Sequence, residues 1–123
     1  MVQTSTGKQM AYTDITLTRD GSVLTITVDR PEVLNTQSRI VKEELDHASA
    51  FAERDIEVII ARAGTHFSAG HDLGNPQEME DCEKHQYSPG TEGEYERSRR
   101  KNIANTLSWR DSSKPTIAQV QGY

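Results

Sequence analysis

The stretch "VIIARAGTHFSAGHDLG", residues 58–74, carries the chain from an aliphatic run into a loop of very small residues. The aliphatic run predicts a short buried strand over Glu57–Ala63, closed by Gly64, and Phe67 can anchor the loop that follows. The loop then contains three residues with small side chains or none: Ser68, Ala69 and Gly70. A ligand can therefore approach the main chain here, where backbone N–H groups can stabilise an oxyanion.

A tight turn explains the same loop without any ligand. Asp72 lies where it can cap a helix that begins near Leu73 or Gly74, since aspartate side chains accept hydrogen bonds from the first N–H groups of helices. Taken alone, this stretch leaves both interpretations open.

The residues before the loop predict a hairpin followed by a helix. "YTDITLTR" (12–19) and "VLTITV" (23–28) both alternate apolar and polar residues, and "DGS" between them is typical of a hairpin turn. A helix is predicted from Ser38 to about Glu53, with Asn35 or Thr36 as its N-cap. One face of that helix carries the apolar residues Val41, Leu45, Ala48 and Ala52. A strand, a helix and a strand in this order predict a right-handed crossover.

The residues after the loop are more polar. They predict a short helix near Gln77–His85, a mobile loop, a second helix over roughly Glu94–Trp109, and a strand over Thr116–Val120. The first eleven residues predict a polar N-terminal arm. The resulting fold class is α/β.

Composition limits the kind of protein this can be. The 123 residues are one domain at most, and only 33% of them are hydrophobic, so we expect a thin core that favours association with further protein. A net charge of −5 disfavours nucleic acid as a partner. The N-terminus has no apolar stretch of signal-peptide length and nothing suggests a membrane span, so a soluble, cytoplasmic protein is expected.

Three motifs occur in a fixed order along the chain: "DRPEVLN" (29–35), "FSAGHDL" (67–73) and "KPTIAQVQGY" (114–123). In this order and spacing the sequence resembles the N-terminal half of the crotonase superfamily, also called the enoyl-CoA hydratase/isomerase family. The resemblance runs from about Tyr12 to Tyr123. It implies a crotonase-like fold of ββα repeats, acyl-CoA thioesters as substrates and no separate cofactor.

The resemblance also implies roles for individual residues. Matching "FSAGHDL" to the family motif puts one of the two oxyanion N–H donors on Ala69. The residues implied to contact coenzyme A or the substrate are Val33, Leu34, Ser68, Ala69, Gly70, His71, Asp72 and Leu73. His71 replaces the alanine that is usual in the family, and its ring is either a ligand contact or an exposed loop side chain. Asn35 is interpreted as a helix cap in preference to a ligand contact.

The resemblance further implies that part of the machinery lies after Tyr123. The second oxyanion donor and the acid and base glutamates of the hydratases match no residue here, so residues 12–123 are expected to be the N-terminal part of a domain and inactive alone. Hydratase, isomerase, decarboxylase and hydrolase activities share this half. The alternative is a non-catalytic truncated protein that binds coenzyme A or only oligomerises. Family members usually form trimers or hexamers.

Other polar groups carry simpler interpretations. The acids after the loop (Glu78, Glu80, Asp81) and the basic cluster (Arg97, Arg99, Arg100, Lys101) are expected to be solvated helix faces. No metal site is predicted, because His47, His66 and His85 lack metal-ligand spacing. The single cysteine, Cys82, excludes an internal disulfide and is expected to be inert.

Overall fold

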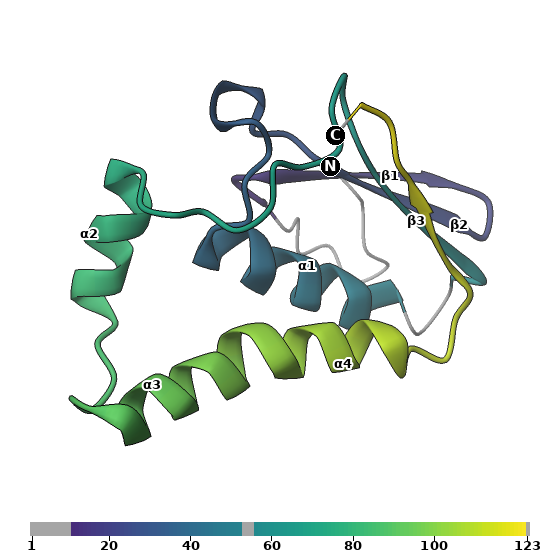
Figure 1. Cartoon of the computed structure of the whole chain (residues 1–123). Coiled ribbons are helices and arrows are strands. Elements are labelled where there is room, and N and C mark those ends of the chain that lie inside the picture. The colour runs from purple at the N-terminus through teal and green to yellow at the C-terminus, as the bar shows by residue number, and fades with distance from the viewer. Residues whose placement is uncertain (1–10, 53–55, 123) are drawn as a thin grey trace.

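The computed structural model describes residues 11–52 and 56–122. The predicted N-terminal arm, apart from its last residue, lies outside the described residues, as do Glu53 at the predicted end of the first helix and Tyr123. A mixed four-stranded sheet in the order β1-β2-β3-β4 carries helices on one face (Figure 1).

The predicted hairpin is confirmed. Strand β1 (Ile15–Asp20) pairs antiparallel with β2 (Val23–Val28), from Ile15 opposite Val28 to Asp20 opposite Val23. The turn between them requires the left-handed conformation at Gly21, with φ of 58°, which glycine adopts without a steric cost.

The predicted strand–helix–strand unit is also confirmed. Helix α1 (Arg39–Ala52) connects β2 to β3 (Val58–Ala63), and β3 runs parallel to β2. Strand β4 (Thr116–Gln119) extends the sheet parallel to β3 and is exposed along its whole length. The small-residue loop therefore begins at the carboxyl edge of a parallel strand, where α/β proteins commonly place ligand sites.

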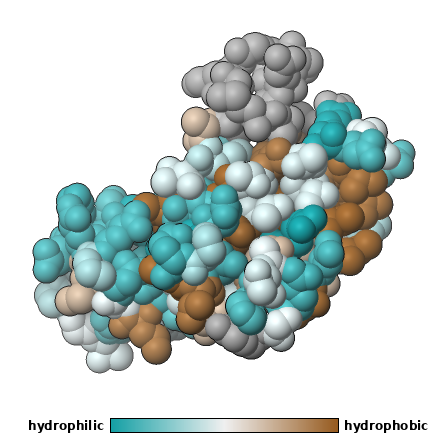
Figure 2. Space-filling view, turned by 90° about the horizontal axis from the view of Figure 1, so that it is seen from above, coloured by the Kyte–Doolittle hydropathy of each residue, from teal (hydrophilic) through white to brown (hydrophobic). Residues whose placement is uncertain are grey.

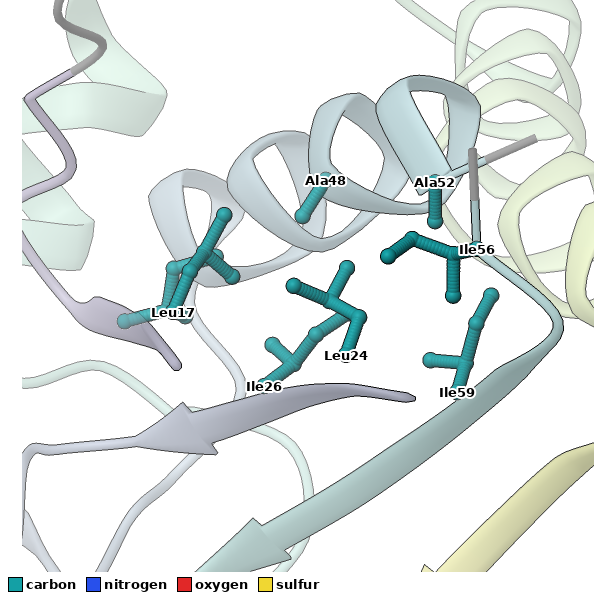
Figure 3. Packing of buried hydrophobic residues seen from close by; sticks show 8 residues of the cluster. Leu17, Leu24, Ile26, Ala48, Ala52, Ile56 and Ile59 are labelled. Carbon is teal, nitrogen blue, oxygen red and sulfur yellow. The ribbon is translucent and has the colours of Figure 1, made fainter. Parts of the chain in front are cut away.

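The core lies between the sheet and α1. Leu17, Leu24 and Ile26 project from the strands toward Ala48 and Ala52 on the helix, which are the positions of the predicted apolar stripe (Figure 3). Ile56 and Ile59 close one end of this cluster. Trp109, which lies near the C-terminal end of the sequence, also packs against it. The small alanines on α1 let the helix approach the sheet closely.

The small-residue loop is followed by a short helix and then by a long helical segment, residues 91–110, which we call the rod. Helix α2 (Pro76–Lys84) confirms the short helix predicted near Gln77–His85. Helices α3 (Thr91–Ser98) and α4 (Ala104–Arg110) are joined by one wider turn at Arg99–Ile103, so the second predicted helix is longer than expected at its start. The rod lies along α1 (Figure 1).

The contacts between the rod and α1 are mainly polar. Lys101 forms an ion pair with Glu43 at 2.7 Å, and Lys42 donates to the amide oxygen of Asn102 at 2.9 Å. Further along, the Asn105 amide donates to the Asp46 carboxylate at 2.7 Å. Apolar burial against the core is thus concentrated at the α4 end, where Trp109 lies.

We predict that stability depends on the buried Leu24 far more than on the exposed Leu73. Leu24 is fully buried, so Leu24→Ala should lower the free energy of unfolding by about 2–5 kcal/mol. Leu73→Ala makes the same chemical change at a side chain that is 98% exposed and should leave stability nearly unchanged. Urea denaturation of both variants gives the comparison. Equal losses would contradict the packing described above.

Candidate functional site

The site is organised by one buried cation. Arg30 lies two residues after the end of β2 and is only 2% exposed. Its Nε lies 3.3 Å from Oδ2 of Asp14, and its Nη1 lies 3.8 Å from Oδ2 of Asp72. Nη1 also donates to the Thr36 carbonyl at 2.7 Å, and Nη2 donates to Gln77 Oε1 at 3.4 Å. Burial raises the pKa of the Asp14 carboxyl, and the charge of Arg30 offsets only part of that rise.

The turn after Arg30 is held by Asn35. The Arg30 N–H donates to Asn35 Oδ1 at 2.7 Å, and the Asn35 amide donates to the His66 carbonyl at 3.0 Å. Leu34 and Asn35 both adopt left-handed backbone, with φ of 55° and 52°. The side chain of Asn35 thus joins the turn to the loop after β3. Its predicted role as a helix cap is wrong, because its oxygen is used by Arg30.

Helix α1 is capped by another residue. The Ser38 hydroxyl accepts from the Val41 N–H at 3.3 Å, and the Ser38 carbonyl accepts from the Lys42 N–H at 3.2 Å. Thr36, the other predicted cap, uses its hydroxyl to donate to Asp72 at 3.2 Å. The helix therefore starts later than either predicted cap would allow.

The small-residue loop pairs with the segment after the turn. The Ala69 N–H donates to the Leu34 carbonyl at 3.0 Å. The Gly70 N–H donates to the Ser68 hydroxyl at 3.0 Å, and that hydroxyl donates to the carbonyl of Asn35 at 2.8 Å. Ser68 takes part in this pairing through its hydroxyl, and Gly70 adopts a positive φ of 99°, a conformation that favours glycine.

His71 occupies a special place in this pairing. It forms an isolated parallel bridge with Gln37, in which the Gln37 N–H donates to the Gly70 carbonyl and the Asp72 N–H donates to the Gln37 carbonyl. The N–H of His71 is directed away from this bridge. Within the described part of the chain it has no acceptor, and it is the one N–H of the segment 69–72 in that state.

Asp72 organises the loop beyond His71. Its Oδ1 accepts from the N–H groups of Gly74 and Asn75 at 3.1 and 3.0 Å. Burial opposes ionisation of this carboxyl, but these two bonds, the Thr36 hydroxyl and the charge of Arg30 together lower its pKa. Asp72 is thus a buried anion that faces the buried cation.

The prediction that Asp72 caps the next helix is wrong. Helix α2 begins later and has its own cap, Asn75, whose side-chain oxygen accepts from the N–H groups of Gln77 and Glu78 at 2.9 and 3.2 Å. The carboxylate of Asp72 is instead used by the turn that precedes the cap.

Of two cavities that border this loop or the turn before it, the larger, of about 290 Å³, lies between the loop, α1, α2 and α3. His71 and Asp72 form part of its wall. A second cavity, of about 200 Å³, lies on the other side of the turn and is lined by Leu34, Asn35 and His66 among others. Among the other predicted ligand residues, Val33, Ser68, Ala69 and Gly70 line neither cavity, and the side chain of Leu73 is exposed.

Two acids that were expected to be solvated lie in the wall of the larger cavity. Glu78 accepts from the Arg39 N–H at the start of α1 at 3.0 Å, and Asp81 pairs with the Arg39 guanidinium at 3.2 Å. For Glu80 the expectation holds, because it is exposed and pairs with Lys84. The face of α2 that carries Glu78 and Asp81 is turned inward by tertiary contacts that helical spacing alone does not reveal.

The basic cluster divides in the same way. Arg97 and Lys101 line the larger cavity, whereas Arg99 is exposed and Arg100 pairs with Glu96 at the surface. Cys82 is half-buried in the same wall, with its sulfur 3.7 Å from Nη2 of Arg97.

Residues 11–52 and 56–122 contain no group of three or more His, Cys, Asp or Glu side chains placed to hold a metal ion. Over the same ranges, no helix has both the length and the apolar character needed to cross a membrane.

Comparison with known proteins gives consistent matches. The model of a family described as enoyl-CoA hydratase/isomerase matches residues 18–123. A curated protein from Mycobacterium tuberculosis, provisionally named enoyl-CoA hydratase EchA13, is 38% identical over 84% of this chain. Crystal structures of a probable enoyl-CoA hydratase from Mycobacterium smegmatis and of an enoyl-CoA hydratase/isomerase from Xanthobacter autotrophicus Py2 are 39% and 30% identical, with TM-scores of 0.73 and 0.75.

Each match covers most of this chain but less than half of the relative. The two crystal structures align with 92% and 91% of this chain, but the chain spans only 42% and 40% of them. It spans 37% of the curated relative. The chain is thus similar to less than half of each relative's length.

We predict that removing the buried cation destabilises the protein strongly. Arg30→Met leaves Asp14 and Asp72 buried without their cation and should lower the free energy of unfolding by about 3–5 kcal/mol. Arg110→Met removes an exposed cation that pairs with Asp111, and it should leave the urea midpoint nearly unchanged because exposed ion pairs contribute little. Similar midpoints for both variants would contradict the role given to Arg30.

Proposed function

Because this chain belongs to the enoyl-CoA hydratase/isomerase family, we propose that it contributes the first half of a site that acts on acyl-CoA thioesters. The proposed chemistry is polarisation of the thioester carbonyl by backbone N–H groups and stabilisation of the resulting enolate. Hydration of an α,β double bond is the proposed outcome.

The observation that carries this proposal is the free N–H of His71 in the wall of the larger cavity. An oxyanion donor must be free of other acceptors and must face the space where the substrate carbonyl lies. Ala69, the residue first expected to supply the donor, gives its N–H to the Leu34 carbonyl instead. We therefore assign the donor to His71, with Ala69 and Gly70 holding the loop in place.

The nucleotide end of coenzyme A is proposed to lie along the turn formed by Val33 and Leu34. The smaller cavity, which Leu34 and His66 line, supports this assignment because it opens next to the same loop. Under this proposal the two backbone segments joined by Asn35 separate the nucleotide side of the site from the acyl side.

The acid and base carboxylates are proposed to come from the remaining part of a complete protein, since the chain spans 37% of its curated relative. The 123-residue chain alone is then expected to turn over no substrate. The alternative function, a non-catalytic protein that binds coenzyme A or only oligomerises, predicts binding without turnover even in the complete protein.

The proposed oxyanion donor can be tested in the complete protein with crotonyl-CoA. His71→Pro removes the N–H and should lower kcat by about 100- to 1,000-fold. His71→Ala keeps the N–H and should lower kcat far less. Replacing the amide at position 71 by an ester removes the N–H without proline's steric effects and should reproduce the loss.

Ala69 provides the control for that experiment. Ala69→Pro breaks the bond to the Leu34 carbonyl, so its effect should appear mainly in the urea unfolding midpoint, while Ala69→Ser should be mild. If Ala69→Pro abolished turnover at an unchanged midpoint and His71→Pro remained active, the donor would be Ala69 after all.

We also propose that the protein assembles into trimers or pairs of trimers. Strand β4 is exposed throughout in this chain, and Ile117 and Val120 are large apolar side chains at that edge, which either the rest of a complete protein or a neighbouring copy can cover. Exposed apolar surface of this kind favours association. Sedimentation of the complete protein should give a trimeric or hexameric mass, and a monodisperse monomer would contradict the proposal.

A further inference from the structure

The larger cavity is lined mostly by residues with polar or charged side chains. Among the described residues that line it there is no Leu, Ile, Val, Phe, Met or Ala, and Tyr87 is the single aromatic ring other than histidine. Pockets for apolar ligands are lined predominantly by hydrophobic side chains. Figure 2 shows the wider setting, since the end of the molecule that carries α2 is covered mainly by hydrophilic residues and larger apolar patches lie at the opposite end.

Besides Arg39, which pairs with Asp81, three further cations lie in this wall. Lys42 comes from α1, Arg97 from α3 and Lys101 from the wider turn of the rod. Burial lowers the pKa of Lys42, Glu78 opposes this effect, and the charges of Arg97 and Lys101 lower the pKa further. The three positive charges are therefore close enough to repel one another, and an anion in the cavity would relieve that repulsion.

The anions of the wall are largely occupied by other partners. Asp81 pairs with Arg39 and Asp72 with Arg30, while Glu78 accepts from the backbone at the start of α1. Asp72 and Asp81 are thus taken by other cations, whereas Glu78 still raises the pKa of Lys42, and Glu94, the fourth acid of the wall, lies 4.0 Å from Arg97.

Lys42 and Arg97 have the weakest partners of the three cations. Lys42 donates to a neutral amide oxygen, that of Asn102, at 2.9 Å. Arg97 reaches the exposed carboxylate of Glu94 only at 4.0 Å, and its other described contact is the Cys82 sulfur at 3.7 Å. Lys101, in contrast, is paired with Glu43 at 2.7 Å. Lys42 and Arg97 can therefore pair with an anionic ligand.

We propose that the acyl group bound beside His71 is short and carries a second carboxylate, which Lys42 and Arg97 bind across the cavity. This substrate class rests on the proposed function, because it takes the larger cavity as the acyl site. A volume of about 290 Å³ is at the small end for ligand pockets and suits a short acyl group. An unbranched fatty acyl chain would leave the charged wall without partners and is disfavoured.

The test compares two acyl groups of equal length in the complete protein. Calorimetry measures binding of adipyl-CoA and hexanoyl-CoA, which differ in the terminal carboxylate, and the expected preference for adipyl-CoA is about 10- to 100-fold. Turnover is followed with the matched unsaturated pair, hex-2-enedioyl-CoA and hex-2-enoyl-CoA, and kcat/KM should favour the first by a similar factor.

Two arginine variants show whether the cavity causes the preference. Arg97→Gln should reduce the ratio of the two affinities to near one. Arg100→Gln removes a cation from the same rod that pairs with Glu96 outside the cavity, and it should leave the ratio unchanged. Both arginines are at least half exposed, so both variants are expected to fold, which the urea midpoint verifies.

The outcomes separate the substrate class from the proposed function. Equal affinities, or a preference for hexanoyl-CoA, would overturn the dicarboxylic substrate class, and turnover of hex-2-enoyl-CoA would then still support the proposed function. A preference for adipyl-CoA that depends on Arg97, without any turnover, would support the substrate class and overturn catalysis. A preference that survives Arg97→Gln would overturn the assignment to this cavity, and failure to bind either thioester would overturn both.

Discussion

The buried guanidinium of Arg30 is the constraint on which the site depends. A cation that is removed from water needs several close partners, and here these come from the approach to β1, the turn after β2, the loop after β3 and the start of α2. Segments far apart in the sequence must therefore meet at one point. The sheet brings the strands together, but Arg30 sets how the loops at their ends lie against each other.

The loops in turn determine which backbone groups are left for chemistry. Three N–H groups of the segment 69–72 are used to join the loop to itself and to the turn, and the alternation of the bridge at Gln37 directs that of His71 outward. The loop packs against the turn through these bonds, and glycine at position 70 is needed for its positive φ of 99°. A free donor is a by-product of that packing, and it is held rigidly because its neighbours are all bonded.

The fold could be predicted from the sequence because it follows from local patterns. Alternation marks β1 and β2, and the apolar stripe on α1 gives the core helix that covers them. The caps could not be predicted reliably, since Asn35 and Asp72 are good cap residues whose side chains accept from nearby N–H groups outside a helix. They also bond to distant groups, the His66 carbonyl and the Thr36 hydroxyl. The same holds for Arg30: charge and spacing do not reveal burial, which depends on contacts between segments that the sequence pattern does not bring together.

The rod formed by α3 and α4 has different kinds of attachment along its length. Its α4 end is fixed by Trp109 in the apolar core, whereas the stretch toward α3 is held to α1 by ion pairs and amide contacts across a wall that water can enter. The rod is thus fixed by apolar packing at its α4 end, and its polar contacts with α1 include Lys101 and Asn102 of the wider turn at Arg99–Ile103. The α3 end of the rod can therefore move outward without exposing the core. Salt weakens the ion pair between Lys101 and Glu43 but not the apolar packing of Trp109. Ionic strength would then act on the width of the larger cavity before it acts on the stability of the sheet.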